Sequence, residues 1–364
     1  MSVQAFSTSH ALVPQQWSEG LEAEVLKKIS YTGLIGKRSD SLLQWKDQLS
    51  NKPGDTETIG LRMQLGDAPK SSSDSVEGNE QTLTVYDMSY SIDEVVDAVR
   101  FKNVVDRQRV TFDMRDEAKA GLADQLSNAW DVSLFNQLGG NDSESRGVFI
   151  GHNTILDHQG VTGQDHYINA ESGTTVDEDL DSGDVFNLAL LDIAVERAKT
   201  LSPAIRPARI PGFDRPLYVC FVHPYQVSSL RRAAASGHNW AGIQMAAMQG
   251  GKVNENPLIT GALGVYNDVL LVESNRVPVG VNSSTDAAVS TVRRAIFCGA
   301  QSAVIGWGRL GGTPRRFRWV EKQFDYDREY GVAAGFLGGI KLTQFNGKPF
   351  STIVLATYAA AATV

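Results

Sequence analysis

The sequence contains little cysteine: Cys220 and Cys298 are the only two among 364 residues. Each lies inside an apolar run, YVCFV or AIFCG, which is typical of reduced, buried thiols in a cytosol-like compartment. Such a chain is not predicted to be a scaffold held together by disulfide bonds. We expect a hydrophobic core to stabilise it instead, because a chain of this length buries roughly three-quarters of its unfolded surface.

Targeting signals and long apolar runs are also absent from the sequence. The N-terminal residues MSVQAFSTSHALVPQQW show no basic start followed by a long apolar stretch, so no export signal is predicted. The most apolar segment, STIVLATYAAAATV, is too short and too rich in Ala and Thr to span a bilayer. We therefore expect a soluble protein that is made in a cytoplasm and has no membrane partner.

Positive charge is scarce, because 34 Lys and Arg stand against 42 Asp and Glu and the net charge is -8. A protein of this charge that works near DNA is expected to bind it only weakly. The segment RRFRW (315–319) interleaves arginine with aromatic residues, a pattern that also occurs in strands that bind nucleic acid. Period-two alternation is the simpler interpretation, because it turns Phe317 and Trp319 toward a core. Arg316 and Arg318 then point outward, where they can pair with acidic groups on a neighbouring subunit.

Familiar catalytic motifs are missing as well: G-x-S-x-G, H-E-x-x-H and C-x-x-C do not occur. GWGRLG (306–311) matches the dinucleotide pattern G-x-G-x-x-G, which requires a helix directly after it. The residues that follow contain a proline and alternating aromatics instead. We therefore expect no enzyme activity, no catalytic residue and no cofactor.

Three histidines, His152, His158 and His166, are weak candidates for a metal site. Imidazole groups bind zinc, but spacings of six and eight residues match no compact metal-binding turn. Residues 140–175 are therefore expected to be a polar surface connector. The acidic run VDEDLDSGD (176–184) fails the calcium-loop pattern at its sixth and twelfth positions. We expect it to be a solvated entry to a helix, with its carboxylates near the positive end of the helix dipole.

A long amphipathic helix is the strongest structural signal in the sequence. Apolar residues recur every four positions from Val110 to Leu138, and the pattern ends at Gly139 and Gly140. A helix over residues 110–138 would be about 43 Å long, enough to span a compact 150-residue domain. Charged residues crowd its first turns, and we expect them to lie off the apolar stripe.

A long hairpin is predicted before this helix. TIGLRMQL and TLTVYDMSYSI alternate with period two, and the sixteen residues between them, 66–81, offer almost nothing to bury. Such a tip suggests an arm that finds its partner on another molecule. Residues 1–55 are sparse in apolar groups, with short helices expected at 17–29 and near 41–49, so this segment must lie on something else. Beyond a proline-rich boundary at 203–216, the chain is predicted to alternate helices and buried strands and to end in strands.

Five segments resemble, in the same order, the major capsid protein family of tailed phages related to coliphage N-four. They are VVDRQRVTFDMRDEAKAGLADQLSNAWDVSLFNQLGGN (104–141), HPYQ (223–226), AAMQGGKVNENPLITGALGVYNDVLLVES (246–274), AIFCGAQSAVIGWGR (295–309) and FDYDREYGVAAGFLGGIKLTQFNGKPF (324–350). The resemblance covers most of the chain from about residue 55 onward. It is specific, because long irregular strings rarely coincide.

The family has the Hong Kong 97-type capsid fold, so the resemblance implies an α+β protein in four parts. These are an N-terminal arm (1–55), an extended hairpin loop (56–95), a peripheral domain (96–215 and 310–364) with a spine helix (110–138), and an axial domain (216–309). It also implies a major capsid protein that self-assembles through hexamers and pentamers into the icosahedral head shell around packaged double-stranded DNA.

The resemblance further implies several partners and a location. Expected partners are copies of the chain itself, a portal, scaffolding or decoration proteins, and DNA in non-specific proximity. The protein is expected in the virion capsid, after assembly in the host bacterial cytoplasm. Charges on its outer parts are expected to form ion pairs between subunits. The candidate inter-subunit contacts are Arg62, Lys70, Glu77, Arg107, Arg109, Arg115, Arg316 and Arg318.

Two alternatives stay open at the level of the sequence. The first is an encapsulin-like shell protein, which uses the same fold to enclose an enzyme cargo in a cellular compartment. The second is an α+β enzyme that uses the glycine-rich loop at 249–264. No nucleophile, metal set or cofactor motif supports the enzyme.

Overall fold

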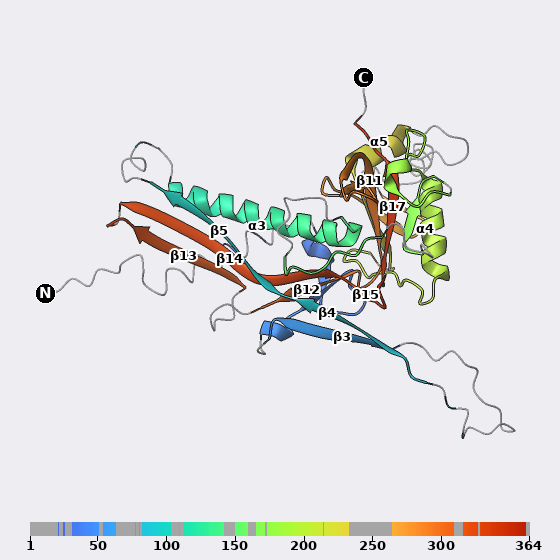
Figure 1. Cartoon of the computed structure of the whole chain (residues 1–364), viewed down its shortest axis with the longest axis horizontal. Helices are drawn as coiled ribbons and strands as arrows, with labels where there is room; N and C mark the ends of the chain where they lie inside the picture. The colour runs from blue at the N-terminus through green and yellow to red at the C-terminus, as the bar shows by residue number, and fades with distance from the viewer. Residues whose placement is uncertain are drawn as a thin grey trace.

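The computed structural model of the protein consists of two large sheets, one long helix and a two-stranded ribbon that projects from them (Figure 1). The described residues are 31–50, 54–62, 82–102, 113–141, 150–158, 165–171, 173–213, 215–232, 264–308, 316–326 and 328–361, with Leu21, Val25, Glu77, Glu80 and Arg109. Strands outnumber helices among them, as an α+β fold organised by its sheets requires.

A six-stranded sheet forms the first body. Its strands are, in order, β1 (Ile35–Gly36), β2 (Leu43–Lys46), β12 (Ala303–Trp307), β14 (Glu329–Leu342) and β13 (Phe317–Phe324), with β5 (Asp93–Phe101) paired to β14. The fourteen residues of β14 organise this sheet, because β12 pairs near one end of β14 and both β13 and β5 pair near the other.

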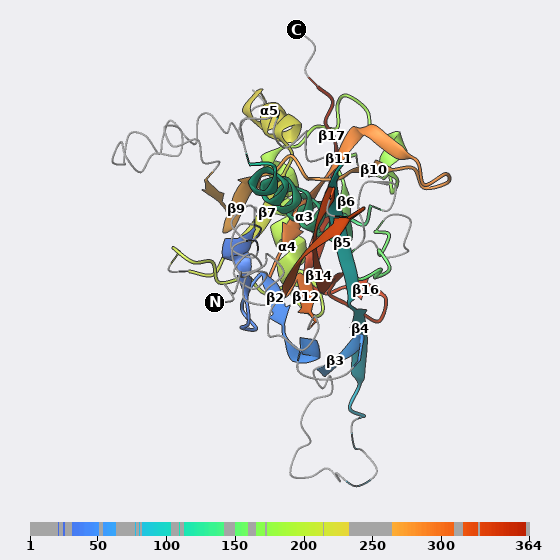
Figure 2. The ribbon, with the colours of Figure 1, turned by 90° about the vertical axis from the view of Figure 1, so that its left-hand side faces the viewer.

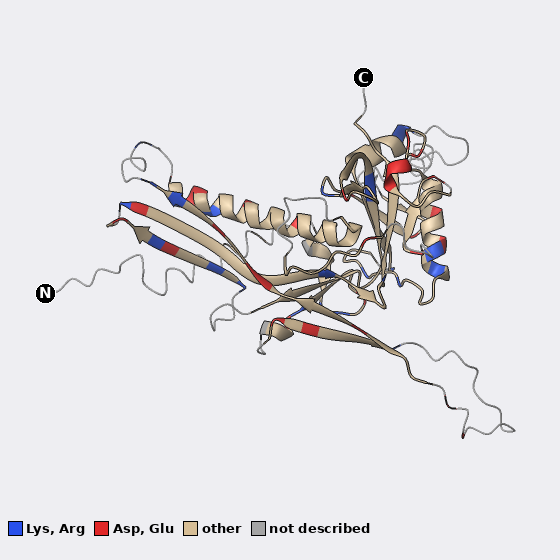
Figure 3. Ribbon diagram, viewed as in Figure 1, with Lys and Arg blue, Asp and Glu red and all other residues tan. Residues whose placement is uncertain are grey.

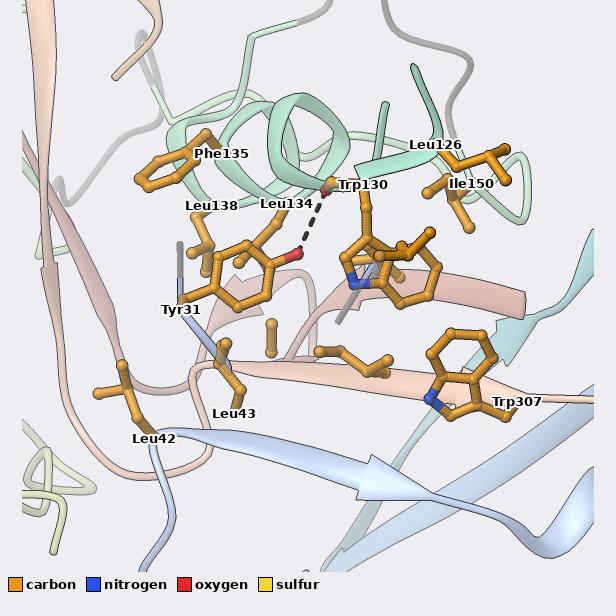
Figure 4. Close-up of a cluster of buried hydrophobic side chains, with 14 of the residues drawn as sticks. Tyr31, Leu42, Leu43, Leu126, Trp130, Leu134, Phe135, Leu138, Ile150 and Trp307 are labelled. Carbon is orange, nitrogen blue, oxygen red and sulfur yellow. Dashed lines mark hydrogen bonds between the residues drawn. The ribbon is translucent and has the colours of Figure 1, made fainter. Parts of the chain in front are cut away.

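The helix α3 (Met114–Gly139) lies along β14 and β5 and covers one face of this sheet (Figure 1). Its 26 residues make it about 39 Å long. The predicted four-residue period is confirmed over most of its length, since every member from residue 118 onward is buried. These members are Ala118, Leu122, Leu126, Trp130, Leu134 and Leu138. The Trp130 ring stacks on Trp307 of β12 with centroids 4.7 Å apart, and the Tyr31 hydroxyl donates to the Trp130 carbonyl at 3.3 Å (Figure 4).

The predicted start of this helix at residue 110 is wrong for α3, which begins at Met114. Asp113 is its N-cap: its backbone is extended (φ -76°, ψ 109°), and its carboxylate accepts a hydrogen bond from the Arg115 amide. The predicted glycine end is confirmed, because Gly140 has φ 65° and its N–H bonds to the Asn136 carbonyl. Val110 and the other apolar residues before the cap lie outside the described residues.

A seven-stranded sheet forms the second body. Its strands are, in order, β6 (Tyr167–Asn169), β17 (Thr352–Tyr358), β11 (Ala288–Cys298), β7 (Tyr218–Val222), β9 (Val269–Glu273) and β8 (Val265–Tyr266), with β10 (Val279–Val281) paired to β11. The helices α4 (Leu188–Thr200) and α5 (Pro224–Arg232) flank it (Figure 1). All five residues of β7 are buried, which fits the fully apolar run from which this strand was predicted.

The chain passes between the two sheets over short connections. β11 belongs to the seven-stranded sheet, and only residues 299–302 separate it from β12 in the six-stranded sheet. β14 returns to the seven-stranded sheet at β17, after the small hairpin β15–β16 (Gln344–Phe345 and Lys348–Pro349). β12 lies in the segment expected to be axial but pairs with β14 of the expected peripheral segment. β17 lies in the expected peripheral segment but pairs with β11 of the expected axial one.

The ribbon consists of β3 (Thr56–Arg62) and β4 (Val85–Ser91), paired from Thr56↔Ser91 to Arg62↔Val85. It points away from both sheets in two perpendicular views (Figures 1 and 2). The predicted hairpin strands and their alternation are confirmed, since Met88 and Tyr90 are buried while Ser89 between them is exposed. Most of the expected tip, residues 66–81, lies outside the described residues.

The N-terminal segment contributes to the core of this same chain. The helix expected near 41–49 is wrong: Leu43–Lys46 form β2, which pairs in parallel with β12, and the short 3-10 turns η1 (Thr32–Leu34) and η2 (Gln48–Ser50) flank it. Leu43 is fully buried in this pairing. Leu21 and Val25 are helical, as predicted, and both are buried in the same core cluster. Part of the expected arm therefore completes its own subunit.

Candidate assembly surfaces and a buried junction

The ribbon is fastened to the body at its root. Tyr90 and Met88 pack with Leu49 and Val304 in a small apolar cluster, and the Tyr90 hydroxyl donates to Glu57 across the ribbon. Gly306 lies under the Tyr90 ring, where a Cβ would overlap the ring carbons. Glycine at this position of β12 is therefore what lets the ribbon approach the sheet closely.

The side chain of Asn153 holds the turn from the ribbon into β5. Its amide donates to the carbonyls of Ser91 and Ile340, each at 3.0 Å, and its oxygen accepts from the Ser91 amide at 2.9 Å. Residues 140–175 were expected to form a polar surface connector, and this is wrong where Asn141, Asn153, His158 and Tyr167 are buried. Polar composition misled here because the Asn141 and Asn153 side chains donate to backbone carbonyls and the Tyr167 hydroxyl donates to Asp177, so these groups are satisfied inside the protein.

Apolar side chains are exposed toward the outer end of the ribbon. Leu83 is 55% exposed and Val85 is 56% exposed. Along β3 the exposed Arg62 pairs with Val85 in the strand register. A groove of about 240 Å³ lies beside the ribbon and is lined by Leu61, Tyr86 and the β15–β16 hairpin among others. Exposed apolar groups next to charge are typical of surfaces that other chains cover.

Two of the predicted inter-subunit arginines make contacts within the chain. Arg115 at the start of α3 donates through Nε to Glu321 at 2.8 Å, and the Trp319 indole donates to the same carboxylate at 2.7 Å. Arg316 stacks over the Trp45 ring at 4.0 Å and lies 4.0 Å from Asp47. Arg115 therefore joins α3 to the six-stranded sheet, and Arg316 links the start of β13 to β2 within that sheet.

The other predicted contacts are distributed along the outside of the molecule. Arg62, Glu77, Arg109 and Arg318 are exposed. Lys70 and Arg107 lie outside the described residues. The alternation predicted for RRFRW is confirmed, since Phe317 and Trp319 are buried and Arg318 between them is exposed. Positive and negative segments are interspersed along α3, β13 and α4 rather than gathered into one basic face (Figure 3).

A buried ion pair joins the end of α3 to the seven-stranded sheet. Arg294 of β11 and Asp177 are both fully buried, and Arg294 Nε donates to Asp177 Oδ2 at 2.7 Å. Arg294 Nη1 also donates to the carbonyls of Gly139 and Gly140, at 3.0 and 2.7 Å. These carbonyls close the C-terminus of α3, where a positive charge is favourable to the helix dipole.

Asp177 accepts further hydrogen bonds that compensate its burial. The Val281 amide donates to Asp177 Oδ2 at 2.8 Å, and the Tyr167 hydroxyl donates to Oδ1. The expectation of a solvated acidic helix entry is therefore wrong for this residue, which lies in the short 3-10 helix η3 (Asp177–Asp179). The helix α4 starts only at Leu188, with Asn187 as its cap.

The three candidate metal-binding histidines face different partners. The exposed His152 lies 2.6 Å from Asp93, and His166 meets the Thr352 carbonyl at 3.0 Å. His158 is buried, and burial together with the neighbouring Arg294 charge lowers its pKa to about 3. The described residues hold no group of three His, Cys, Asp or Glu side chains arranged to bind a metal ion.

The two cysteines are buried and free, as predicted. Burial raises the pKa of both thiols, that of Cys298 to about 12. They are therefore inert packing residues of β7 and β11. Among the described helices, none combines the length and apolar character needed to cross a membrane. The glycine-rich loop at 249–264, which the enzyme alternative uses, lies outside the described residues except for Gly264.

Solved structures with the same arrangement of sheets, long helix and ribbon are tailed-phage capsids. The capsid of Ralstonia phage GP4 matches with a TM-score of 0.73 and 26% identity, covering 100% of this chain and 97% of that chain. The capsid asymmetric unit of cyanophage Pam1 matches with a TM-score of 0.73 and 19% identity, over 93% of this chain and 94% of that one. The predicted α+β Hong Kong 97-type fold is confirmed, and it defines the class as a capsid protein of tailed phages.

Sequence comparison assigns the family within this class. The family model for phage capsid protein matches residues 5–361, so the chain belongs to the phage capsid protein family. The major capsid protein of Pseudomonas phage KPP25 is 25% identical over 296 residues, which are 74% of this chain and 73% of that protein.

Proposed function

We propose that this chain is the major capsid protein of a tailed phage and builds the icosahedral head shell around packaged double-stranded DNA. The family match over residues 5–361 carries this proposal. The structure supports it, because a ribbon with exposed apolar residues projects from the two sheets and leaves that surface for another chain to cover. The function is structural, with no catalytic step and no cofactor.

Within such a subunit, we assign the domains by sheet rather than by a single boundary near residue 309. The six-stranded sheet with α3 is the peripheral domain and α3 is its spine. The seven-stranded sheet with α4 and α5 is the axial domain, and the ribbon is the extended loop. Strand pairing supports this division, since β12 and β17 each bind the sheet on the other side of that boundary.

The contacts between copies are proposed to use exposed charge for register. Arg62, Glu77, Arg109 and Arg318 are exposed and therefore accessible to a neighbour, with Lys70 and Arg107 proposed from the sequence. Charges at an interface steer association and suppress wrong pairings, and heterologous contacts that close give hexamers and pentamers. A portal and scaffolding or decoration proteins complete the list of proposed partners.

The acidic balance of the chain suits its proposed place in the virion. A net charge of -8 with interspersed signs leaves packaged DNA in non-specific proximity without strong adhesion. Assembly is proposed to occur in the host bacterial cytoplasm, a reducing compartment in which the thiols of Cys220 and Cys298 stay reduced.

The proposal is tested by electron microscopy of the purified full-length protein over a range of salt and protein concentrations, with and without co-expressed phage head genes. Closed shells of uniform diameter are expected. Arg62→Glu is expected to lower the yield of shells by at least tenfold, while Lys199→Glu on the outer surface of α4 leaves it unchanged. Monomers or small rings under every condition would contradict the proposal.

A further inference from the structure

The strand β5 presents one free edge. It pairs with β14 along all nine of its positions, from Asp93↔Gly338 to Phe101↔Tyr330. Among the described residues, β14 is its only strand partner. A long edge strand offers a row of unpaired N–H and C=O groups on which another strand can add, and this is a common route to aggregation.

Two aspartates occupy donors of this edge. The Glu94 amide donates to Asp93 Oδ1 at 2.7 Å, and the Ala98 amide donates to Asp97 Oδ1 at 2.8 Å. Neighbouring N–H groups of a strand point to opposite sides, so amides four residues apart point the same way.

β12 and β5 both pair with Gly338, so they flank β14 on opposite sides. The Leu337 carbonyl accepts from the Gly308 amide on the β12 side, so Leu337 does not exchange hydrogen bonds with its register partner Glu94. The amides of Glu94 and Ala98 therefore belong to the free edge.

The arrangement is held from outside the strand as well. His152 Nε2 lies 2.6 Å from Asp93 Oδ2, so both oxygens of this carboxylate have partners. Only the Val96 position separates the two occupied amides on that edge, and the Val96 side chain is 54% exposed. An incoming strand needs alternate amides in a row, and here two of three successive ones are taken by negatively charged groups.

We infer that Asp93 and Asp97 bar the free edge of β5 to strand addition by a second copy of this chain. The incoming strand must break both hydrogen bonds and bring its own carbonyl oxygens against two carboxylates, which repel them. Copies of the chain are thereby directed to other surfaces. The inference goes beyond the shell function and concerns the subunit before assembly, so it stands or fails independently of it.

The test uses a cysteine placed at the centre of the edge. Val96→Cys is made in the full chain, and a short thiol-to-thiol crosslinker is added to the unassembled subunit at neutral pH. The native cysteines are buried and do not compete. In antiparallel pairing of two β5 edges about this position, the two introduced thiols face each other within reach of the crosslinker.

Covalent dimers are expected to be at background with Val96→Cys alone and to rise at least tenfold when Asp93→Ala and Asp97→Ala are added. Asp93→Asn with Asp97→Asn keeps an acceptor oxygen at each position, and this pair is expected to stay within threefold of background. The matched control is Asp116→Ala with Asp179→Ala, two exposed aspartates outside β5, which changes the net charge equally.

Two outcomes would overturn the inference. One is strong crosslinking of Val96→Cys alone, and the other is an alanine pair that crosslinks no more than the control pair. Circular dichroism and the monomer fraction on size exclusion show that each variant is folded before it is crosslinked. If the alanine pair does not fold, single substitutions at Asp93 and Asp97 replace it, each with an expected rise of at least threefold over the asparagine pair.

Discussion

Removing the guanidinium of Arg294 should separate the end of α3 from the seven-stranded sheet. Arg294→Met keeps the length and apolar stem of the side chain but removes the hydrogen bonds to Asp177, Gly139 and Gly140. It also leaves the Asp177 carboxylate buried without its cation. Breaking a buried ion pair by removing one partner costs about 3–5 kcal/mol. This is a large share of a typical free energy of unfolding of about 5–15 kcal/mol.

The assay is urea unfolding of the unassembled subunit, followed by circular dichroism. With a slope of about 3 kcal/mol per molar urea, a loss of about 4 kcal/mol lowers the midpoint by about 1.3 M. Hydrogen exchange gives a local measure, because amides of the last turn of α3 should exchange faster once its carbonyls lose their cation. Arg318→Met is the control, since this exposed arginine on β13 should change stability by less than about 0.5 kcal/mol.

The double variant Arg294→Met with Asp177→Asn separates the ion pair from simple packing. It removes both charges, and the asparagine oxygen still accepts from the Val281 amide or the Tyr167 hydroxyl. The double variant should therefore be more stable than the additive sum of the single variants by about 2 kcal/mol or more. Additive losses, or an Arg294→Met variant within about 1 kcal/mol of the original protein, would refute the reasoning.

Three further predictions concern glycine, histidine and cysteine. Gly306→Ala should lower the free energy of unfolding by about 1–3 kcal/mol, because the added Cβ overlaps the Tyr90 ring. Gly121→Ala on the open side of α3 should raise it by about 0.5–1 kcal/mol. Urea midpoints that shift in the same direction for both variants would contradict this. His158 stays neutral when the protein is folded, because its pKa is about 3. Its contribution to the free energy of unfolding is therefore full above pH 6.5 and falls toward pH 3, by up to about 1.4 kcal/mol per pH unit. His158→Gln should flatten this slope when unfolding is measured from pH 4 to 7. Cys220 and Cys298 should both resist a thiol reagent at pH 8 until urea unfolds the chain, and reaction in the native state would disprove their burial.

The sequence predicted elements whose signal is local. The apolar period of α3, the continuous apolar run of β7 and the alternation of β4 each survive because one stretch of chain contains the whole pattern. β2 was misjudged as a helix because its strand character comes from β12, a partner far away in the sequence. No window around Leu43 contains that information.

The buried junction was missed for the same reason. Asp177 lies in a run whose composition is that of a solvated segment, and its cation is 117 residues further along the chain. One signal was available: period two places Arg294 on the same face of β11 as Val292 and Ile296, both fully buried. An arginine on an apolar face predicts a buried acidic partner, although it does not say which one.

The two short passages of chain between the sheets, at 299–302 and from β14 to β17, have a mechanical consequence. A single connection would let the two sheets rotate about it, whereas several connections together with a shared apolar core oppose that rotation. We therefore expect the two sheets to move as one body. In a closed shell built from rigid subunits, the curvature comes from the angles between neighbouring copies. The angle between the two sheets within each copy stays constant.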